Sequence, residues 1–112
     1  MKYHHCGIPV PSVLPGMEHL AAYKVWAGDH QDNPFGIQFM HYEPGCTLPE
    51  PVRTRPHLAF EVEDLDAALE GREILIAPNS PSPGVRVAFI LERGEPVELL
   101  EFGDAGDPRR AG

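Results

Sequence analysis

Short runs in which apolar and polar residues alternate recur along the chain, and most of them end at a proline, a glycine or a polar turn. Alternation with a period of two is typical of strands that bury one face. In the first half the pattern predicts strands over residues 3–10, 20–27 and 36–42, with a polar loop over 28–34. In the second half it predicts strands over residues 57–62, 73–77, 85–91 and 96–102, with a loop over 78–84 and a tight turn at Arg93–Gly94.

One short helix is predicted between the first two strands of the second half. Asp64 is a good N-cap residue, and Leu65, Ala68 and Leu69 follow at the spacing of an apolar stripe on a helix. Gly71 then ends the helix.

Helix-breaking residues are frequent, with 13 prolines and 11 glycines among 112 residues. Pro15 and Gly16 interrupt residues 13–17, so no helix is predicted where the first half would have one. Three prolines fall within residues 46–56, and this stretch is predicted to be an irregular linker.

The two halves share a pattern. Each begins with a strand that carries a histidine, His5 or His57, and each ends with a strand that carries Gln38 or Glu98 between apolar residues. The spacing within the pairs is 38 − 5 = 33 and 98 − 57 = 41 residues, and the difference corresponds to one short helix. The repeat predicts a single domain (1–112) of two modules, about 2–46 and 56–103, with a flexible tail at 104–112.

If the two modules join in one curved sheet, these four polar side chains can converge on its concave face. Two imidazoles, a carboxylate and an amide oxygen in an apolar cup suit a divalent metal such as Zn, Fe, Ni, Co or Mn. The cup is expected to be lined by Tyr3, Met40, Tyr42, Ala59, Phe89 and Leu100.

The remaining histidines have no counterpart in the repeat. Strand alternation predicts that His4 points away from His5. His19, His30 and His41 are expected in loops or at the surface.

The charge balance of nine basic and 17 acidic residues gives a formal charge of −8. Nucleic-acid binding is disfavoured because phosphate contacts need clustered Lys and Arg. No apolar run approaches the roughly 18 residues that span a membrane. The two cysteines are too few for a disulfide scaffold, and a cytoplasmic protein with free thiols is expected.

Three segments carry a resemblance to a known superfamily: the H-x-G-I motif from His5 to Ile8, the run HLAFEVEDLDAAL at 57–69 and the hairpin at 85–102. In these the chain resembles the vicinal oxygen chelate superfamily, which includes glyoxalase I, methylmalonyl-CoA epimerase, extradiol dioxygenases and the bleomycin and fosfomycin resistance proteins. The resemblance implies an α+β fold in which two βαβββ modules form a cup-shaped mixed sheet, here with the first helix reduced or missing. It implies metal ligands at His5, Gln38, His57 and Glu98, a set similar to that of the epimerase branch.

Three functions remain open at this point. The first is a metal-dependent lyase or isomerase that acts through an enolate, with Glu98 as both ligand and general base. The second is an Fe(II) extradiol-type dioxygenase that uses His5, His57 and Glu98, although Gln38 would occupy a position left to water, oxygen or substrate. The third is a binding protein that sequesters a drug, for which the acidic charge suits a cationic ligand. A small-molecule ligand and a homodimer are expected in each case.

Overall fold

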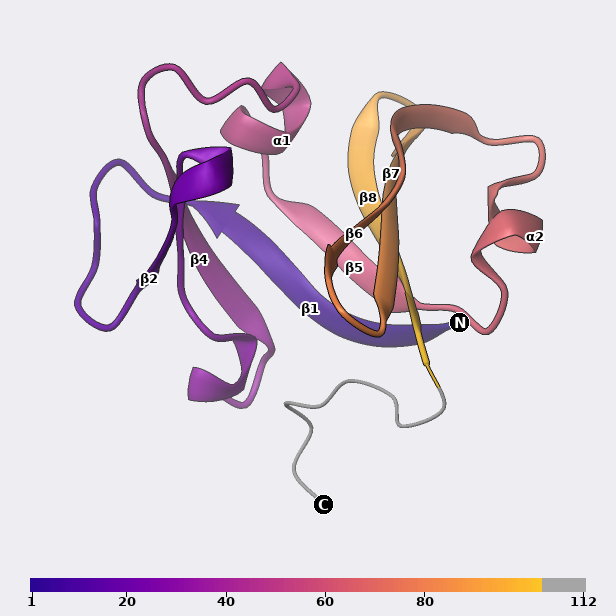
Figure 1. Cartoon of the computed structure of the whole chain (residues 1–112), viewed down its shortest axis with the longest axis horizontal. Coiled ribbons are helices and arrows are strands. Elements are labelled where there is room, and N and C mark those ends of the chain that lie inside the picture. The colour runs from indigo at the N-terminus through magenta and orange to yellow at the C-terminus, as the bar shows by residue number, and fades with distance from the viewer. Residues whose placement is uncertain (104–112) are drawn as a thin grey trace.

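The computed structural model describes residues 1–103, which form a mixed eight-stranded sheet that curls into a half-barrel (Figure 1). The strands are β1 (Lys2–Pro9), β2 (Glu18–Leu20), β3 (Val25–Ala27), β4 (Ile37–Tyr42), β5 (His57–Glu61), β6 (Glu73–Ser82), β7 (Val85–Glu92) and β8 (Glu95–Phe102).

The strand order is symmetric about the centre of the sheet, running β2-β3-β4-β1-β5-β8-β7-β6. β1 and β5 are antiparallel neighbours at the centre, and each pairs on its other side with a parallel strand, β4 or β8. The two halves of the chain therefore have the same topology. This confirms the expected α+β cup.

The described residues contain two short α-helices, α1 (Glu50–Thr54) and α2 (Leu65–Leu69), and neither is long and apolar enough to cross a membrane. The second half contains α2 between its first two strands, as predicted. In the first half no helix lies between Pro9 and Glu18, and only a one-turn 3₁₀ helix follows β2 at Ala21–Tyr23.

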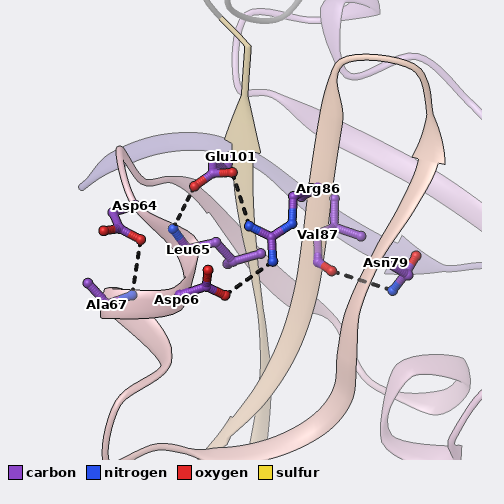
Figure 2. A network of polar contacts seen from close by, with 8 residues as sticks. All are labelled: Asp64, Leu65, Asp66, Ala67, Asn79, Arg86, Val87 and Glu101. Carbon is purple, nitrogen blue, oxygen red and sulfur yellow. Dashed lines mark hydrogen bonds and ion pairs between the residues drawn. The ribbon is translucent and has the colours of Figure 1, made fainter.

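The N-terminus of α2 is capped as the sequence indicates, because Asp64 Oδ1 accepts a hydrogen bond from the Ala67 amide at 3.2 Å. Arg86 of β7 anchors the helix by pairing with Asp66 at 3.1 Å and with Glu101 of β8 at 3.3 Å (Figure 2). Glu101 also accepts a hydrogen bond from the Leu65 amide at 2.9 Å. These contacts hold α2 on the outer face of the second half.

Two apolar clusters lie on opposite faces of the second half of the sheet. On the outer face, Leu65 and Leu69 of α2 pack against the sheet residues Ala88, Ile90 and Leu99. Inner-face residues comprise Ala59, Val87 and Leu100. Polar side chains placed between the inner-face residues therefore project into the cup.

The linker prediction for residues 46–56 was wrong in part, because α1 forms there. Pro51 stands in the first turn of this helix, where a backbone N–H has no intrahelical acceptor and proline is tolerated. Val52 is almost fully buried, with 2 % of its surface exposed. In Figure 1, α1 lies at the top of the view, between the two halves of the sheet.

The loop predicted over residues 78–84 is mostly strand. β6 continues to Ser82, with irregular pairing to β7 from Ile74 onward. As the edge of the sheet, β6 can include prolines, since its outward amides need no partner. Asn79 lies in this irregular part of β6, and its side chain donates a hydrogen bond to Val87 O of β7 at 3.4 Å (Figure 2).

The strand predicted over residues 20–27 is interrupted by the 3₁₀ helix at Ala21–Tyr23, so that β2 ends at Leu20 and β3 begins at Val25. β2 and β3 pair as antiparallel neighbours, and Lys24 precedes β3 with a left-handed φ of 56°. The predicted polar loop over 28–34 contains a further one-turn 3₁₀ helix at His30–Asp32.

Candidate metal centre

The pairing of the two central strands explains the histidine motifs of both halves. His5 lies opposite Ala59, and His57 lies opposite Gly7, so each histidine faces the small residue two positions after the other. A Cβ atom on Gly7 would lie 2.2 Å from His57 Cε1. Gly7 therefore leaves the space that the His57 imidazole occupies. Ala59 has the equivalent position beside His5 and is fully buried.

The parallel strands β4 and β8 place Gln38 and Glu98 opposite the same two small residues. Gly7 pairs with Gln38, and Ala59 pairs with Glu98. Gln38 and Glu98 therefore have equivalent positions in the two halves of the sheet. Both side chains line the same cavity, and Gln38 Nε2 donates a hydrogen bond to Gly28 O at 3.0 Å.

Three of the four predicted ligands converge. Glu98 Oε1 lies 3.2 Å from His5 Nε2 and 3.2 Å from His57 Nε2. One potential ligand atom from each residue lies within 4.8 Å of the others. Both histidines are buried, and the Glu98 side chain is 13 % exposed. Two borderline nitrogen donors and one hard oxygen donor form a set that fits a divalent transition metal or zinc.

Two opposing effects set the charge state of Glu98. Burial raises the pKa of its carboxyl group, but hydrogen bonds from His5 and His57, together with their charges, outweigh burial and lower the pKa to about 2. The carboxylate is therefore ionised at neutral pH and needs to lose no proton to bind a cation.

The three residues line a cavity of about 640 Å³, which lies within the size range of small-molecule sites. Its apolar wall includes Met40, Tyr42, Phe89 and Leu100, all four of which the sequence predicted. Leu48 and Val52 line it as well. The sequence did not predict these two lining residues, because the prolines of residues 46–56 indicated an irregular linker where α1 forms.

Tyr42 has a pKa raised well above the ordinary value of tyrosine, first by burial and then by the negative charge of Glu98. Its hydroxyl therefore remains protonated inside the cavity and can donate a hydrogen bond.

Two residues predicted to line the cup are not among the lining residues of this cavity. Ala59 is fully buried. Tyr3 is half exposed, and its ring meets Phe60 edge-on at 6.2 Å while its hydroxyl donates to Phe35 O at 2.8 Å.

A β-bulge in β1 accounts for the position of Tyr3. Tyr3 pairs with Phe60 and His5 pairs with Ala59, so β1 has one residue, His4, more than β5 across this interval. The bulge reverses the alternation, and Tyr3 therefore does not share the inner face with His5.

The same bulge brings His4 beside His5 and contradicts the prediction that it points away. Their Nδ1 atoms lie 2.6 Å apart, and His4 is buried. Since only one of the two facing nitrogens can carry the proton, this contact couples the protonation of the two rings and holds the orientation of the His5 ring. His57 differs, because its buried Nδ1 has no hydrogen-bond partner within residues 1–103.

His30 was expected in a loop or at the surface, yet it is buried against His4 with ring centroids 4.4 Å apart. Asn33 shapes this loop by donating to Ile37 O at 2.9 Å and accepting from the Phe35 and Ile37 amides at 3.1 Å. The polar composition of residues 28–34 gave no sign that one of its residues turns inward.

The other two histidines lie outside the cavity lining. His19 stacks on Trp26 at 4.2 Å and pairs with Glu43 at 2.6 Å. His41 Nδ1 lies 3.1 Å from Val10 O.

No family model and no curated protein sequence matches the chain. Solved structures do match. Methylmalonyl-CoA epimerase from Mycobacterium tuberculosis superposes with a TM-score of 0.64 at 20% identity, over 93% of this chain and 89% of that one. A hypothetical protein from Bacillus halodurans C-125 superposes with a TM-score of 0.62 at 21% identity, over 99% and 97% of the two chains. The protein has the vicinal oxygen chelate fold.

The vicinal oxygen chelate fold explains the symmetry of the site. Each half contributes one histidine from its first strand and one carboxylate or amide residue from its last strand. The cavity can therefore hold a cation at its floor and a small organic molecule against its apolar walls.

Proposed function

We propose that the chain is a metal-dependent isomerase or lyase that acts on a small oxygenated substrate through an enolate-type intermediate. The observation that supports this most directly is the convergence of His5, His57 and Glu98 at a cavity of small-molecule size. The fold shared with a methylmalonyl-CoA epimerase is consistent with isomerase chemistry.

In this proposal His5, Gln38, His57 and Glu98 hold one Zn, Fe, Ni, Co or Mn ion. When bound, such an ion supplies a Lewis acid that stabilises negative charge on a substrate oxygen. The carboxylate of Glu98 is ionised in advance, as its low pKa indicates, so binding of the cation needs no deprotonation of that ligand.

The chain's own groups then orient the substrate and accept a proton. The walls around Met40, Phe89 and Leu100 exclude water from the reacting carbon. The Tyr42 hydroxyl, which stays protonated, donates a hydrogen bond to a substrate oxygen. Glu98 is the ionised group at the cavity floor, and we propose it as the acceptor of the proton that leaves carbon.

The experiment follows the exchange of a carbon-bound proton for solvent deuterium by NMR, in neutral α-hydroxyketones such as acetoin and 2-hydroxyacetophenone. We expect one metal ion per chain and exchange that requires this ion, with both lost in His5→Ala and retained in His19→Ala. A purified protein without stoichiometric metal, whose metal content His5→Ala leaves unchanged, would overturn the proposal.

An Fe(II) dioxygenase is the second candidate, because the three residues that converge are two histidines and one carboxylate, a set that suits non-haem iron. Anaerobic loading with Fe(II), followed by oxygen and a catechol, separates the two functions. Oxygen uptake coupled to ring cleavage would favour the dioxygenase, and its absence would favour the isomerase or lyase.

A metal-free binding protein is the third candidate, and the carboxylates Glu18, Asp29 and Glu98 around the cavity are the observation that favours it. Thermal shifts with a ligand panel, with and without a chelator, test this function. Ligand-induced shifts that a chelator leaves unchanged would favour it over both enzymes.

We also propose that the protein forms a homodimer. The outer face of the second half is covered by α2, whereas the first half has no such helix. Large apolar side chains on β4 and β5 stay exposed, among them Phe39 at 37 % and Leu58 at 47 %. A second copy of the chain would bury this surface.

A further inference from the structure

Away from the two histidines, the charged side chains that line the cavity within residues 1–103 are all carboxylates. Its lining includes the carboxylates of Glu18, Asp29 and Glu98, and within residues 1–103 it includes no lysine or arginine. Glu98 lies at the floor beside the two histidines. Glu18 is exposed on β2, so it belongs to the rim of the cavity.

The arginines nearest in sequence to lining residues have partners elsewhere. Arg53 follows Val52 in α1, and its Nε donates to Leu48 O at 2.8 Å. Arg86 lies between two lining residues of β7 but binds Asp66 and Glu101 on the outer face. In the described chain neither guanidinium is placed to meet an anion in the cavity. Lys24, which lies between two lining residues, is exposed with its Nζ beside Gly45 and is not part of the lining.

The rest of the wall is mainly apolar. Leu20 and Tyr23 line it from the first half of the chain, and Ile76, Phe89 and Leu100 line it from the second. Such a wall favours a hydrocarbon or aromatic body. A carboxylate or phosphate placed against it would lose hydration without gaining a cation, and would also be repelled by the cavity carboxylates.

The lining therefore gives no support for binding the phosphate groups of a coenzyme A thioester inside this cavity. A coenzyme A thioester carries phosphate groups, which proteins ordinarily bind with arginine, lysine or helix N-termini. The described lining of this cavity has no arginine or lysine.

We infer that the substrate is a small molecule with a largely apolar body whose end away from the metal ligands is neutral or cationic, and that substrates with a carboxylate or phosphate at that end are rejected. This inference rests on the proposed function for the position of the reacting end. The charge selectivity itself rests on the cavity lining.

A matched set of probes tests the selectivity. Benzohydroxamate, 4-(aminomethyl)benzohydroxamate and 4-carboxybenzohydroxamate have the same metal-binding head and differ in charge at the far end. Their dissociation constants for the metal-loaded protein are measured by calorimetry. We expect the neutral and ammonium probes to agree within about threefold and the carboxylate probe to bind at least about tenfold more weakly, since each tenfold step is 1.4 kcal/mol. A carboxylate probe that binds as tightly as the neutral one would overturn the inference.

Charge reversal at the rim gives a second measurement. In Glu18→Lys we expect the carboxylate probe to bind at least about fivefold more tightly than in the unaltered protein, because a cation then faces it. Glu63→Lys makes the same charge change at an exposed residue outside the cavity lining and should leave the affinity unchanged. Equal effects of the two variants would contradict a local role of the cavity charge.

Failure of the metal centre would be distinguishable from failure of this inference. If the chain binds no metal, saturation-transfer NMR on the metal-free protein compares 3-phenylpropanol, 3-phenylpropylammonium and 3-phenylpropionate. The cavity lining predicts transfer to the first two and little to the third. Transfer to 3-phenylpropionate equal to that of the alcohol would overturn the charge selectivity, whatever the fate of the metal proposal.

Discussion

His5 takes its orientation from its neighbour in sequence, His4, through the 2.6 Å contact between their Nδ1 atoms. Groups that hold the second nitrogen of a metal-binding histidine typically change metal affinity 10- to 100-fold when removed. We therefore expect His4→Phe to weaken metal binding by a factor on the order of ten or more.

The conservative variant separates orientation from packing. The Asn side-chain amide in His4→Asn can either accept from or donate to His5 Nδ1, so we expect this variant to recover most of the affinity that His4→Phe loses. Calorimetric titration with Zn or Co measures both variants, and circular dichroism checks that both are folded. Equal metal affinity in His4→Phe and the unaltered protein would show that His4 does not position His5.

Glu98 makes the stability of the metal-free protein depend on acid. Its folded pKa, about 2, lies below its ordinary value of 4.5, so its stabilising contribution is fully present above pH 4.5 and is lost as the pH falls toward 2. The contribution is on the order of 3 kcal/mol. In urea unfolding between pH 6 and 3, we expect Glu98→Gln to depend less steeply on pH than the unaltered protein. Parallel pH profiles would contradict this origin of the low pKa.

At the residue scale, the sequence predicted that His5 and His57 have equivalent strand positions, as do Gln38 and Glu98, and the strand pairing has both equivalences. It was wrong about His4 and Tyr3 for one reason. A β-bulge inserts a residue into β1 and changes the alternation, and nothing in the side chains of residues 2–5 marks that insertion. His30 was missed because its burial depends on a loop that Asn33 shapes through backbone contacts.

At the scale of elements, the antiparallel pairing of β1 and β5 places Gly7 opposite His57. A methyl group there would meet the His57 ring at 2.2 Å, so we expect Gly7→Ala to displace the imidazole and weaken metal binding at least about tenfold. Overpacking of this kind also costs about 1–3 kcal/mol of stability. Metal titration and thermal unfolding measure the two effects.

A matched control separates the loss of the site from the loss of stability. Asp64→Ala removes the N-cap of α2 and costs about 1 kcal/mol, on the face opposite the cavity. We expect it to lower the melting temperature with metal affinity unchanged. If Asp64→Ala weakened metal binding as much as Gly7→Ala does, the effect of Gly7→Ala would be one of general stability.

The elements themselves were predicted best where local chemistry decides them. The cap and apolar stripe of α2 lie within a few residues of sequence, and the helix formed as expected. The sequence did not predict α1 or the far end of β6, because proline ordinarily interrupts helices and strands. Proline is compatible with the first turn of a helix and with an edge strand, but only the assembled sheet shows that β6 is an edge.

At the scale of the whole molecule, the two halves have the same topology, but only the second half has a helix, α2, packed on the outer face of its strands. We expect a homodimer of about twice 12.4 kDa in light scattering, held in part by the exposed apolar side chains of β4 and β5. Leu58→Glu should convert it to a monomer, because a buried unpaired charge is costly. Ile74→Glu changes a residue of similar exposure on β6 and should leave the dimer intact. A monomeric unaltered protein would contradict the proposal.

The central claim is that one divalent metal ion binds between the two halves of the sheet. Anomalous scattering from crystals grown with Co or Ni tests it most directly. We expect a single strong peak at roughly 2.0–2.2 Å from His5 Nε2, His57 Nε2 and a Glu98 oxygen. Crystals that show metal elsewhere, or no peak beside these three side chains at saturating metal, would contradict the account.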